Sequence, residues 1–111
     1  MSNDELTESI SVVEDLFGIS PIPESGLGHH TIITHPDMRI VILAFSSGHL
    51  LKEHAAPFPV LMQALDGELQ VRAAGVETRL VPGKLLRMDR MLRHEVQAVL
   101  PSRLMLTLFT T

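Results

Sequence analysis

The stretch from Gly48 to Glu68, GHLLKEHAAPFPVLMQALDGE, contains both a candidate functional residue and a candidate strand. His54 follows a glycine at a short distance, and a strand-like apolar run after it ends at the turn signal Asp66-Gly67. A histidine placed in this way is a candidate metal ligand on the wall of a β-barrel. The side chains that follow His54 are largely apolar, so further metal ligands would have to come from other parts of the chain.

Beyond this stretch, the chain consists largely of short apolar runs separated by turn signals, a pattern that predicts an all-β protein. Short apolar runs recur near residues 30–34, 39–45, 49–52, 59–65, 68–73, 76–81, 84–88, 95–100 and 103–109. Turn signals rich in Gly, Pro, Asp and Ser separate them, and this spacing is typical of an antiparallel sandwich or small barrel. We therefore expect many short strands and no parallel sheet.

Two of these runs are apolar on both faces. Ile40–Phe45 and Leu104–Phe109 lack the alternation of a strand with one wet face. A doubly apolar strand in a small sheet protein needs a cover, which here is either an N-terminal helix or a second subunit. We expect a homodimer that packs one sheet against its copy.

The N-terminus predicts a helix from Ser2 to Leu16. Ser2 and Glu5 have the spacing of a capping box, and apolar residues follow at helical spacing. Gly18 is placed to end the helix, and two prolines soon after it prevent its resumption. The predicted organisation is a helical segment and linker over residues 1–27, followed by a barrel domain over residues 28–111.

Composition argues against several classes of protein. The chain has 111 residues, a net charge of −4, no Tyr, no Trp and no Cys. It therefore lacks both the basic surface and the stacking aromatics of a nucleic-acid-binding protein. Its longest apolar run, Ile40–Phe45, is too short to cross a membrane. The acidic start without an apolar core behind it predicts a cytoplasmic location, and any metal would need His, carboxylate or Met ligands.

The order of motifs resembles the cupin superfamily, and in particular its small single-domain, RmlC-like members. Gly48, His54 and Gly67 match the first cupin motif, and Gly83 and His94 match the second. The resemblance covers about residues 38 to 110. It implies a double-stranded β-helix, that is, a jelly-roll barrel, preceded here by the short helical segment.

The resemblance also implies a metal site that this sequence does not complete. The second histidine of the first motif is replaced by Ala56 and its glutamate by Val60. In the second motif, Asp89 replaces a proline, Met91 a glycine and Ala98 an asparagine. The glycines that match the two motifs, here called the framework glycines, predict the fold; they are Gly48, Gly67 and Gly83. Two of the four metal ligands of the motifs are missing.

Strand alternation predicts the surroundings of the remaining pair. If His54 points into the barrel, Val60, Met62 and Ala64 share its face; Met88 faces inward from a later strand. We therefore predict a ligand-binding site formed by His54, Met62, Met88 and His94. Metal, if it binds His54 and His94 at all, should be a weakly held divalent ion such as Zn, Ni, Cu or Fe, and no tightly bound cofactor is expected.

Three functions agree with this site. The first is a cupin that binds a small molecule in an apolar barrel, polarised by the two histidines. The second is a metal-dependent enzyme, dioxygenase-like or isomerase-like, that uses His54 and His94 with further ligands from water, Met62 or substrate. The third is a metal-free enzyme with His94 as general base. The sequence does not name a substrate.

Other polar residues have simpler interpretations. His29, His30 and His35 cluster outside the motifs and are expected to be solvated side chains at strand and loop edges. Arg90 and Arg93 are expected near the barrel mouth, where an anionic ligand could reach them.

Overall fold

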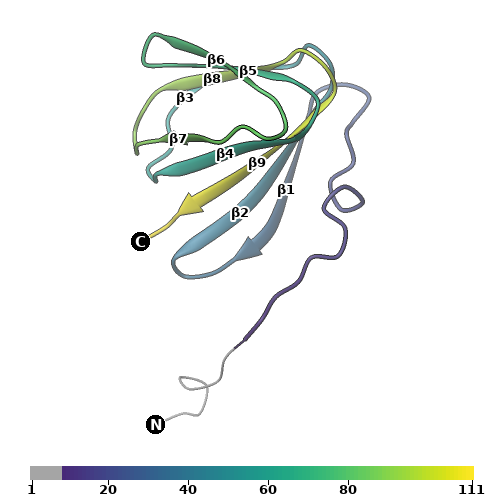
Figure 1. Cartoon of the computed structure of the whole chain (residues 1–111), viewed down its shortest axis with the longest axis vertical. Helices are drawn as coiled ribbons and strands as arrows, with labels where there is room; N and C mark the ends of the chain where they lie inside the picture. The colour runs from purple at the N-terminus through teal and green to yellow at the C-terminus, as the bar shows by residue number, and fades with distance from the viewer. Residues whose placement is uncertain (1–8) are drawn as a thin grey trace.

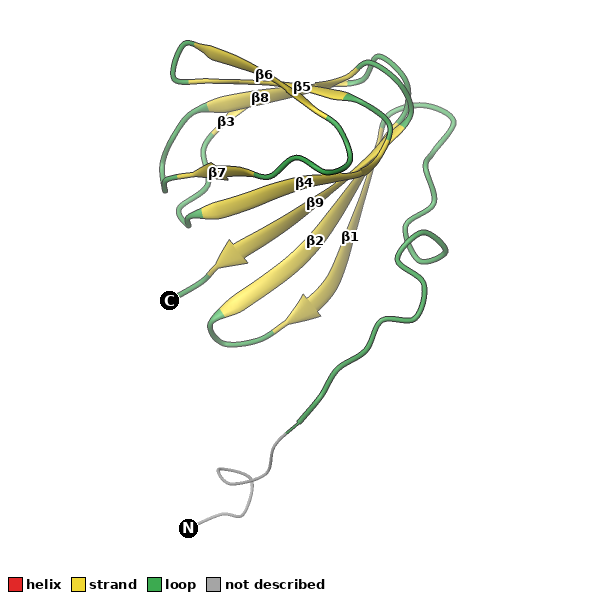
Figure 2. Cartoon of the chain, in the orientation of Figure 1, coloured by secondary structure: helices red, strands yellow, loops and turns green. Residues whose placement is uncertain are grey.

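The computed structural model describes residues 9–111, and within this range all regular structure is strand. Nine antiparallel strands form two sheets, which Figure 2 shows as the two layers of the barrel. Their bounds are β1 Leu27–Thr34, β2 Met38–Phe45, β3 Leu50–His54, β4 Val60–Asp66, β5 Leu69–Ala73, β6 Val76–Leu80, β7 Leu86–Met88, β8 His94–Ala98 and β9 Ser102–Phe109. The predicted all-β jelly-roll architecture is confirmed.

The strands are not ordered as they occur along the chain. The larger sheet has the order β1-β2-β9-β4-β7 and the smaller one β3-β8-β5-β6. The two sheets face each other (Figure 1), and β9 lies between β2 and β4. The last strand in the chain, β9, therefore completes the larger sheet. In the smaller sheet, β8 carries His94 of the second motif and pairs with β3, which carries His54 of the first motif.

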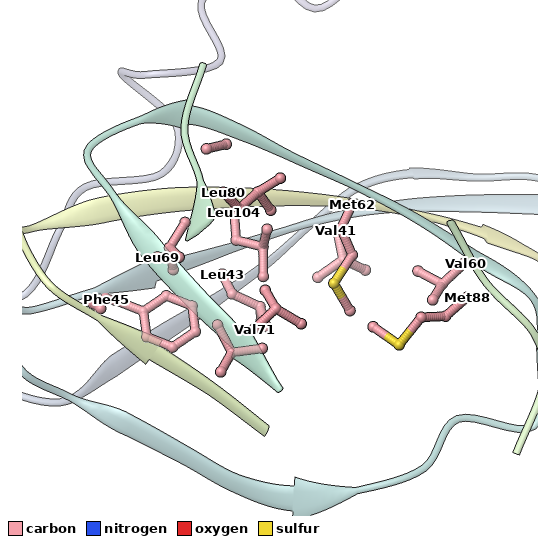
Figure 3. Close-up of a cluster of buried hydrophobic side chains, with 13 residues drawn as sticks. Val41, Leu43, Phe45, Val60, Met62, Leu69, Val71, Leu80, Met88 and Leu104 are labelled. Atoms are coloured by element: carbon pink, nitrogen blue, oxygen red, sulfur yellow. The ribbon is translucent and has the colours of Figure 1, made fainter. Parts of the chain in front are cut away.

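The core fills the space between the two sheets. Alternate side chains of each strand point inward, as the period of two requires, and they form one cluster of buried apolar residues (Figure 3). Phe45, Leu69, Leu80 and Leu104 are fully buried in it. The barrel is therefore packed with apolar side chains over much of its interior.

The framework glycines are required by the turns that they occupy. Gly48, Gly67 and Gly83 all have positive φ, a conformation that glycine adopts without a steric penalty. A Cβ atom on Gly67 would overlap the side chain of Ser102 and the carbonyl of Pro101. The prediction that these glycines specify the fold is consistent with this geometry.

Two other residues adopt positive φ without being glycine. Ala74 has φ 51° in the turn between β5 and β6, and Met91 has φ 63° in the loop before β8. For an L-residue with a Cβ this region costs about 1–2 kcal/mol. Met91 occupies the position where the cupin motif has a glycine, and its N–H donates to the carbonyl of Ala56 at 2.7 Å.

The predicted N-terminal helix is wrong where the structure describes it. Its residues 2–8 lie outside the described range, and residues 9–16 are irregular. Beyond them, a turn carries Phe17 to Ser20 against Arg103 of β9, whose guanidinium donates to the Ser20 carbonyl at 2.8 Å. The apolar residues of this segment have helical spacing, but in the single chain they have no surface to pack against, and Ile10 is 88% exposed. Helical spacing alone does not stabilise a helix.

Candidate functional site

His54 and His94 are brought together by strand pairing. His54 ends β3, His94 begins β8, and the two are direct partners in the antiparallel ladder after an irregularity that follows Leu51. Side chains of direct partners lie on the same face. The two imidazole rings accordingly lie 4.3 Å apart between centroids, tilted by 56°.

Each imidazole is oriented by a backbone carbonyl two residues earlier. Nδ1 of His54 lies 2.9 Å from the carbonyl oxygen of Lys52, and Nδ1 of His94 lies 2.9 Å from that of Leu92. A carbonyl oxygen only accepts, so both Nδ1 atoms carry the hydrogen. In the neutral rings, both Nε2 atoms are therefore left with a free lone pair, able to accept a hydrogen bond or bind a cation.

The two rings differ in their environment. His94 is 4% exposed, whereas His54 is an exposed residue at the barrel rim. Burial lowers the pKa of His94 below its usual value of 6.5, the bond to the Leu92 carbonyl acts in the opposite direction, and the nearby His54 lowers it further. His94 is therefore a neutral imidazole at neutral pH.

The residues present do not fit a resident metal of the cupin type. Such a site needs about three protein ligands with one position left open. Across residues 9–111 there is no group of three or more His, Cys, Asp or Glu side chains placed to hold a metal ion. Val60 is 3% exposed in the apolar core, and Ala56 offers no donor atom. The two histidines supply half of a site.

The two methionines of the predicted site lie deeper than the histidines. Met62 on β4 is 2% exposed and Met88 on β7 is 3% exposed, and both belong to the buried apolar cluster (Figure 3). Val60 is the strand partner of Met88, and Met62 that of Leu86. The methionines therefore serve first as packing, and Met88 also lines a hollow.

This hollow lies between the β5–β6 hairpin and the chain from Leu86 to Leu92, and it has a volume of about 210 Å³. It adjoins the histidine pair at two points, because Ala73 is the strand partner of His94 and Leu92 supplies the carbonyl that His94 donates to. Its wall is mostly apolar and consists of Val71, Ala73, Ala74, Val76, Thr78, Leu86, Arg87, Met88 and Leu92. Of these residues the sequence predicted only Met88, since no local motif marks residues that only the closed barrel brings together.

A second hollow, of about 330 Å³, is lined in part by three glutamates and two arginines that form ion pairs. Arg72 pairs with Glu77 and Glu95, and Arg93 pairs with Glu53 at 2.7 Å. Arg93, expected to face an anionic ligand, is thus bound by a carboxylate of its own chain. These exposed pairs add little stability.

The remaining histidines lie on other parts of the chain. His29 and His35 are exposed. His30 is half-buried, and its Nε2 is buried beside Gly28 without a hydrogen-bond partner in the described part of the chain. His49 is half-buried with its ring 6.1 Å from that of Phe45. Only His54 and His94 form a pair with oriented nitrogens within residues 9–111.

Comparison with known proteins identifies the fold. No family model matches the sequence, and no curated protein matches it. A conserved protein of unknown function from Streptococcus pyogenes has a similar structure, with a TM-score of 0.79 and 19% identity over 95% of this chain and 91% of that one. An RmlC-like cupin from Shewanella frigidimarina has a TM-score of 0.74 and 20% identity over 95% and 93%.

Solved structures with chemical activities share the same barrel. A salicylate 1,2-dioxygenase variant from Pseudoaminobacter salicylatoxidans has a TM-score of 0.71 and 15% identity, over 76% of this chain and 26% of that one. The protein has the cupin fold, as the motif resemblance implied. Proteins of this fold have varied functions, so the function must be argued from the site.

The described residues contain no helix that is long and apolar enough to cross a membrane.

Proposed function

We propose that this cupin binds a small molecule in the smaller hollow, beside the His54–His94 pair, and holds metal weakly or not at all. The observation that carries the proposal is the bonding of both Nδ1 atoms to carbonyl oxygens. It leaves two acceptor nitrogens on a histidine pair whose neighbours Ala73 and Leu92 line the apolar hollow, although neither imidazole is part of its wall. Nε2 of the neutral His94 is a hydrogen-bond acceptor, so a ligand that donates a hydrogen bond suits this residue.

The size of the hollow limits the ligand. Its volume of about 210 Å³ lies below the roughly 300–1,000 Å³ of sites for drug-sized molecules. An apolar cavity of about 150 Å³ is enough for benzene. The ligand class is therefore a molecule of about one ring with a hydroxyl or N–H group; a carboxylate would face the neutral imidazole of His94 without a proton to share.

A pair of probes tests this chemistry. Phenol donates a hydrogen bond, and anisole has a similar shape without the donor. We expect phenol to shift the imidazole NMR signals of His94 with saturable binding, and anisole to bind more weakly. Ala73→Leu, which fills the hollow, should abolish phenol binding, while Ala55→Leu, outside its wall, should retain it. Equal binding of both probes, or no effect of Ala73→Leu, contradicts the proposal.

The alternative is a metal-dependent enzyme of the dioxygenase or isomerase kind. Its support is the same pair of free Nε2 atoms, which are suited to bind a divalent ion. The missing third ligand argues against it. Elemental analysis of untagged protein separates the two: a stoichiometric metal favours the enzyme, and its absence favours the binding protein. The cytoplasmic location remains a prediction.

A further inference from the structure

The smaller hollow lies between two edge strands. Among the described residues, β6 is an edge of the smaller sheet and β7 is an edge of the larger one. Figure 1 shows β6 in the upper layer and β7 in the lower layer. The wall of the hollow includes Thr78 of β6 and Met88 of β7. A molecule in the hollow therefore lies beside backbone that could pair with a further strand.

The backbone of Glu77 points to the open edge of β6. Ala73 and Val76 are strand partners on either side of the two-residue turn Ala74-Gly75. In such a hairpin this first pair exchanges both backbone hydrogen bonds, and bonded pairs then alternate along the ladder. Glu77 and Arg79 therefore direct their N–H and C=O groups away from β5.

Lys84 occupies one part of this edge and leaves Glu77 open. The Lys84 ammonium donates to the carbonyl of Arg79 at 2.8 Å, which agrees with a carbonyl that faces away from β5. Within residues 9–111, no backbone group of a turn or loop pairs with Glu77. Glu77 thus presents a donor and an acceptor side by side, the pair that an added strand uses.

The outer face beside Glu77 has more negative than positive charge. Arg72 is the strand partner of both Glu77 and Glu95, and its guanidinium pairs with both carboxylates. One positive charge thus serves two negative ones. The residue directly opposite Glu77 on an added strand has its side chain on this same face, where a lysine complements the charge.

The next side chain of an added strand points into the hollow. Successive side chains alternate between faces, so the residue opposite Val76 lies on the face that Val76 and Thr78 share, and both of these line the hollow. An apolar cavity of about 150 Å³ holds benzene, so the hollow of about 210 Å³ accommodates one ring. In a protein, a ring with a hydroxyl group is the side chain of tyrosine.

We propose that β6 binds an extended peptide segment of another protein, which adds an antiparallel strand to the smaller sheet. A lysine of the peptide lies opposite Glu77 and exchanges two backbone hydrogen bonds with it, and the tyrosine after it enters the hollow. In this mode of recognition the main chain supplies affinity and the pocket supplies specificity. The inference rests on the proposed function, because it names what carries the ring into the same hollow.

Glu77→Pro tests the backbone pairing. Proline removes the N–H of residue 77 and is tolerated on an edge strand where that N–H faces solvent. Glu77→Gln is the matched control, because it loses the same charge and keeps the N–H.

The probe is a capped peptide of about seven residues, a usual strand length, with lysine then tyrosine at its centre and threonine elsewhere. The protein has no Tyr and no Trp, so the fluorescence anisotropy of the peptide tyrosine reports binding to the full chain. We expect saturable binding to wild type, weakened at most about fivefold in Glu77→Gln. Glu77→Pro should weaken it by about a further tenfold or more. Equal affinities of the two variants overturn the proposal.

Phenol separates this inference from the proposed function, because phenol needs the hollow but not the edge of β6. Phenol should bind wild type and Glu77→Pro equally, and Ala73→Leu should abolish binding of both phenol and peptide. Phenol binding without peptide binding overturns the peptide inference alone, and failure of both probes to bind wild type overturns both proposals.

Two further measurements keep the proposal testable. If Glu77→Pro does not fold, N-methylation of the peptide lysine, which removes the N–H that donates to Glu77, should weaken binding, while N-methylation of the tyrosine should not. Equal effects of the two methyl groups overturn the proposal. Hydrogen exchange at the Glu77 amide that slows as the concentration of free protein rises would place a second copy on this edge and also overturn it.

Discussion

The imidazole rings of His54 and His94 lie 4.3 Å apart between centroids, and each ring donates its Nδ1 hydrogen to the carbonyl two residues before it. Because both rings have this arrangement, both Nε2 atoms have a free lone pair in the neutral rings and can accept a hydrogen bond. The His94 ring is buried, whereas the His54 ring is exposed. Within residues 9–111 no third His, Cys, Asp or Glu side chain is placed to join this pair at a metal ion.

The first prediction concerns pH. Burial lowers the pKa of His94 in the folded state, so the unfolded chain binds more protons once the pH falls below about 6.5. The contribution of His94 to stability is full above that pH and is lost as the pH falls through the lower, folded value. Urea denaturation from pH 8 to pH 5 should show this loss for wild type and a smaller one for His94→Gln. Identical profiles contradict the prediction.

The second prediction concerns the missing ligands. Ala56→His with Val60→Glu restores the two ligand types that the first motif lacks. Without metal, the buried glutamate should destabilise the protein, because position 60 lies in the apolar core. Zn²⁺ or Ni²⁺ at about 100 times its dissociation constant should then raise the free energy of unfolding by about 2.7 kcal/mol.

Thermal denaturation with and without the ion measures this gain. Wild type should show a much smaller shift at the same concentration, and adding His54→Ala to the double variant should remove it. A large metal-dependent shift in the wild type that is lost in His54→Ala would show that the natural pair is already a working site.

The third prediction concerns the turn between β5 and β6. Ala74 and Gly75 both have positive φ, the pattern of a type I′ hairpin turn, for which Asn-Gly is the preferred pair. Ala74→Asn should therefore raise the free energy of unfolding by about 0.5–1 kcal/mol, because Asn tolerates the left-handed region better than Ala. Ala55→Asn, at a position without positive φ, serves as the control in chemical denaturation.

The fourth prediction concerns the anchor of the N-terminal segment. Arg103→Lys keeps the charge but loses the planar fork that reaches Asp66 and the carbonyls of Phe17 and Ser20 together. We expect faster chymotrypsin cleavage at Phe17, with the strands still protected from hydrogen exchange. Arg79→Lys, in an exposed pair with Glu68, should leave the cleavage rate unchanged.

Much of the barrel could be predicted because each strand and each turn has a signal within its own short stretch of sequence. The alternation in β5 and β8 and the glycines at positions 48, 67 and 83 each report a strand or a turn directly. The helix predicted over Ser2–Leu16 is wrong over residues 9–16, the part that the structure describes, since helical spacing without a surface to pack on does not stabilise a helix.

The site was predictable only in part. The pairing of His54 with His94 followed from the motif resemblance, because direct strand partners share a face. The hollow beside them could not be read from the sequence, since Thr78, Leu86 and Leu92 meet only after two sheets close. The carbonyl bonds from Lys52 and Leu92 also have no sequence signal, because every residue carries a carbonyl.

The central place of β9 in the larger sheet has a consequence for how the chain reaches its fold. Neither β2 nor β4 has its full set of neighbours until residues 102–109 arrive. During synthesis, two strands with apolar faces and open edges must wait while the intervening chain is made. Such strands are prone to pair with other molecules, and contacts between residues so distant in sequence form slowly. Assembly of the barrel is therefore expected to follow completion of β9, rather than to proceed strand by strand from the N-terminus.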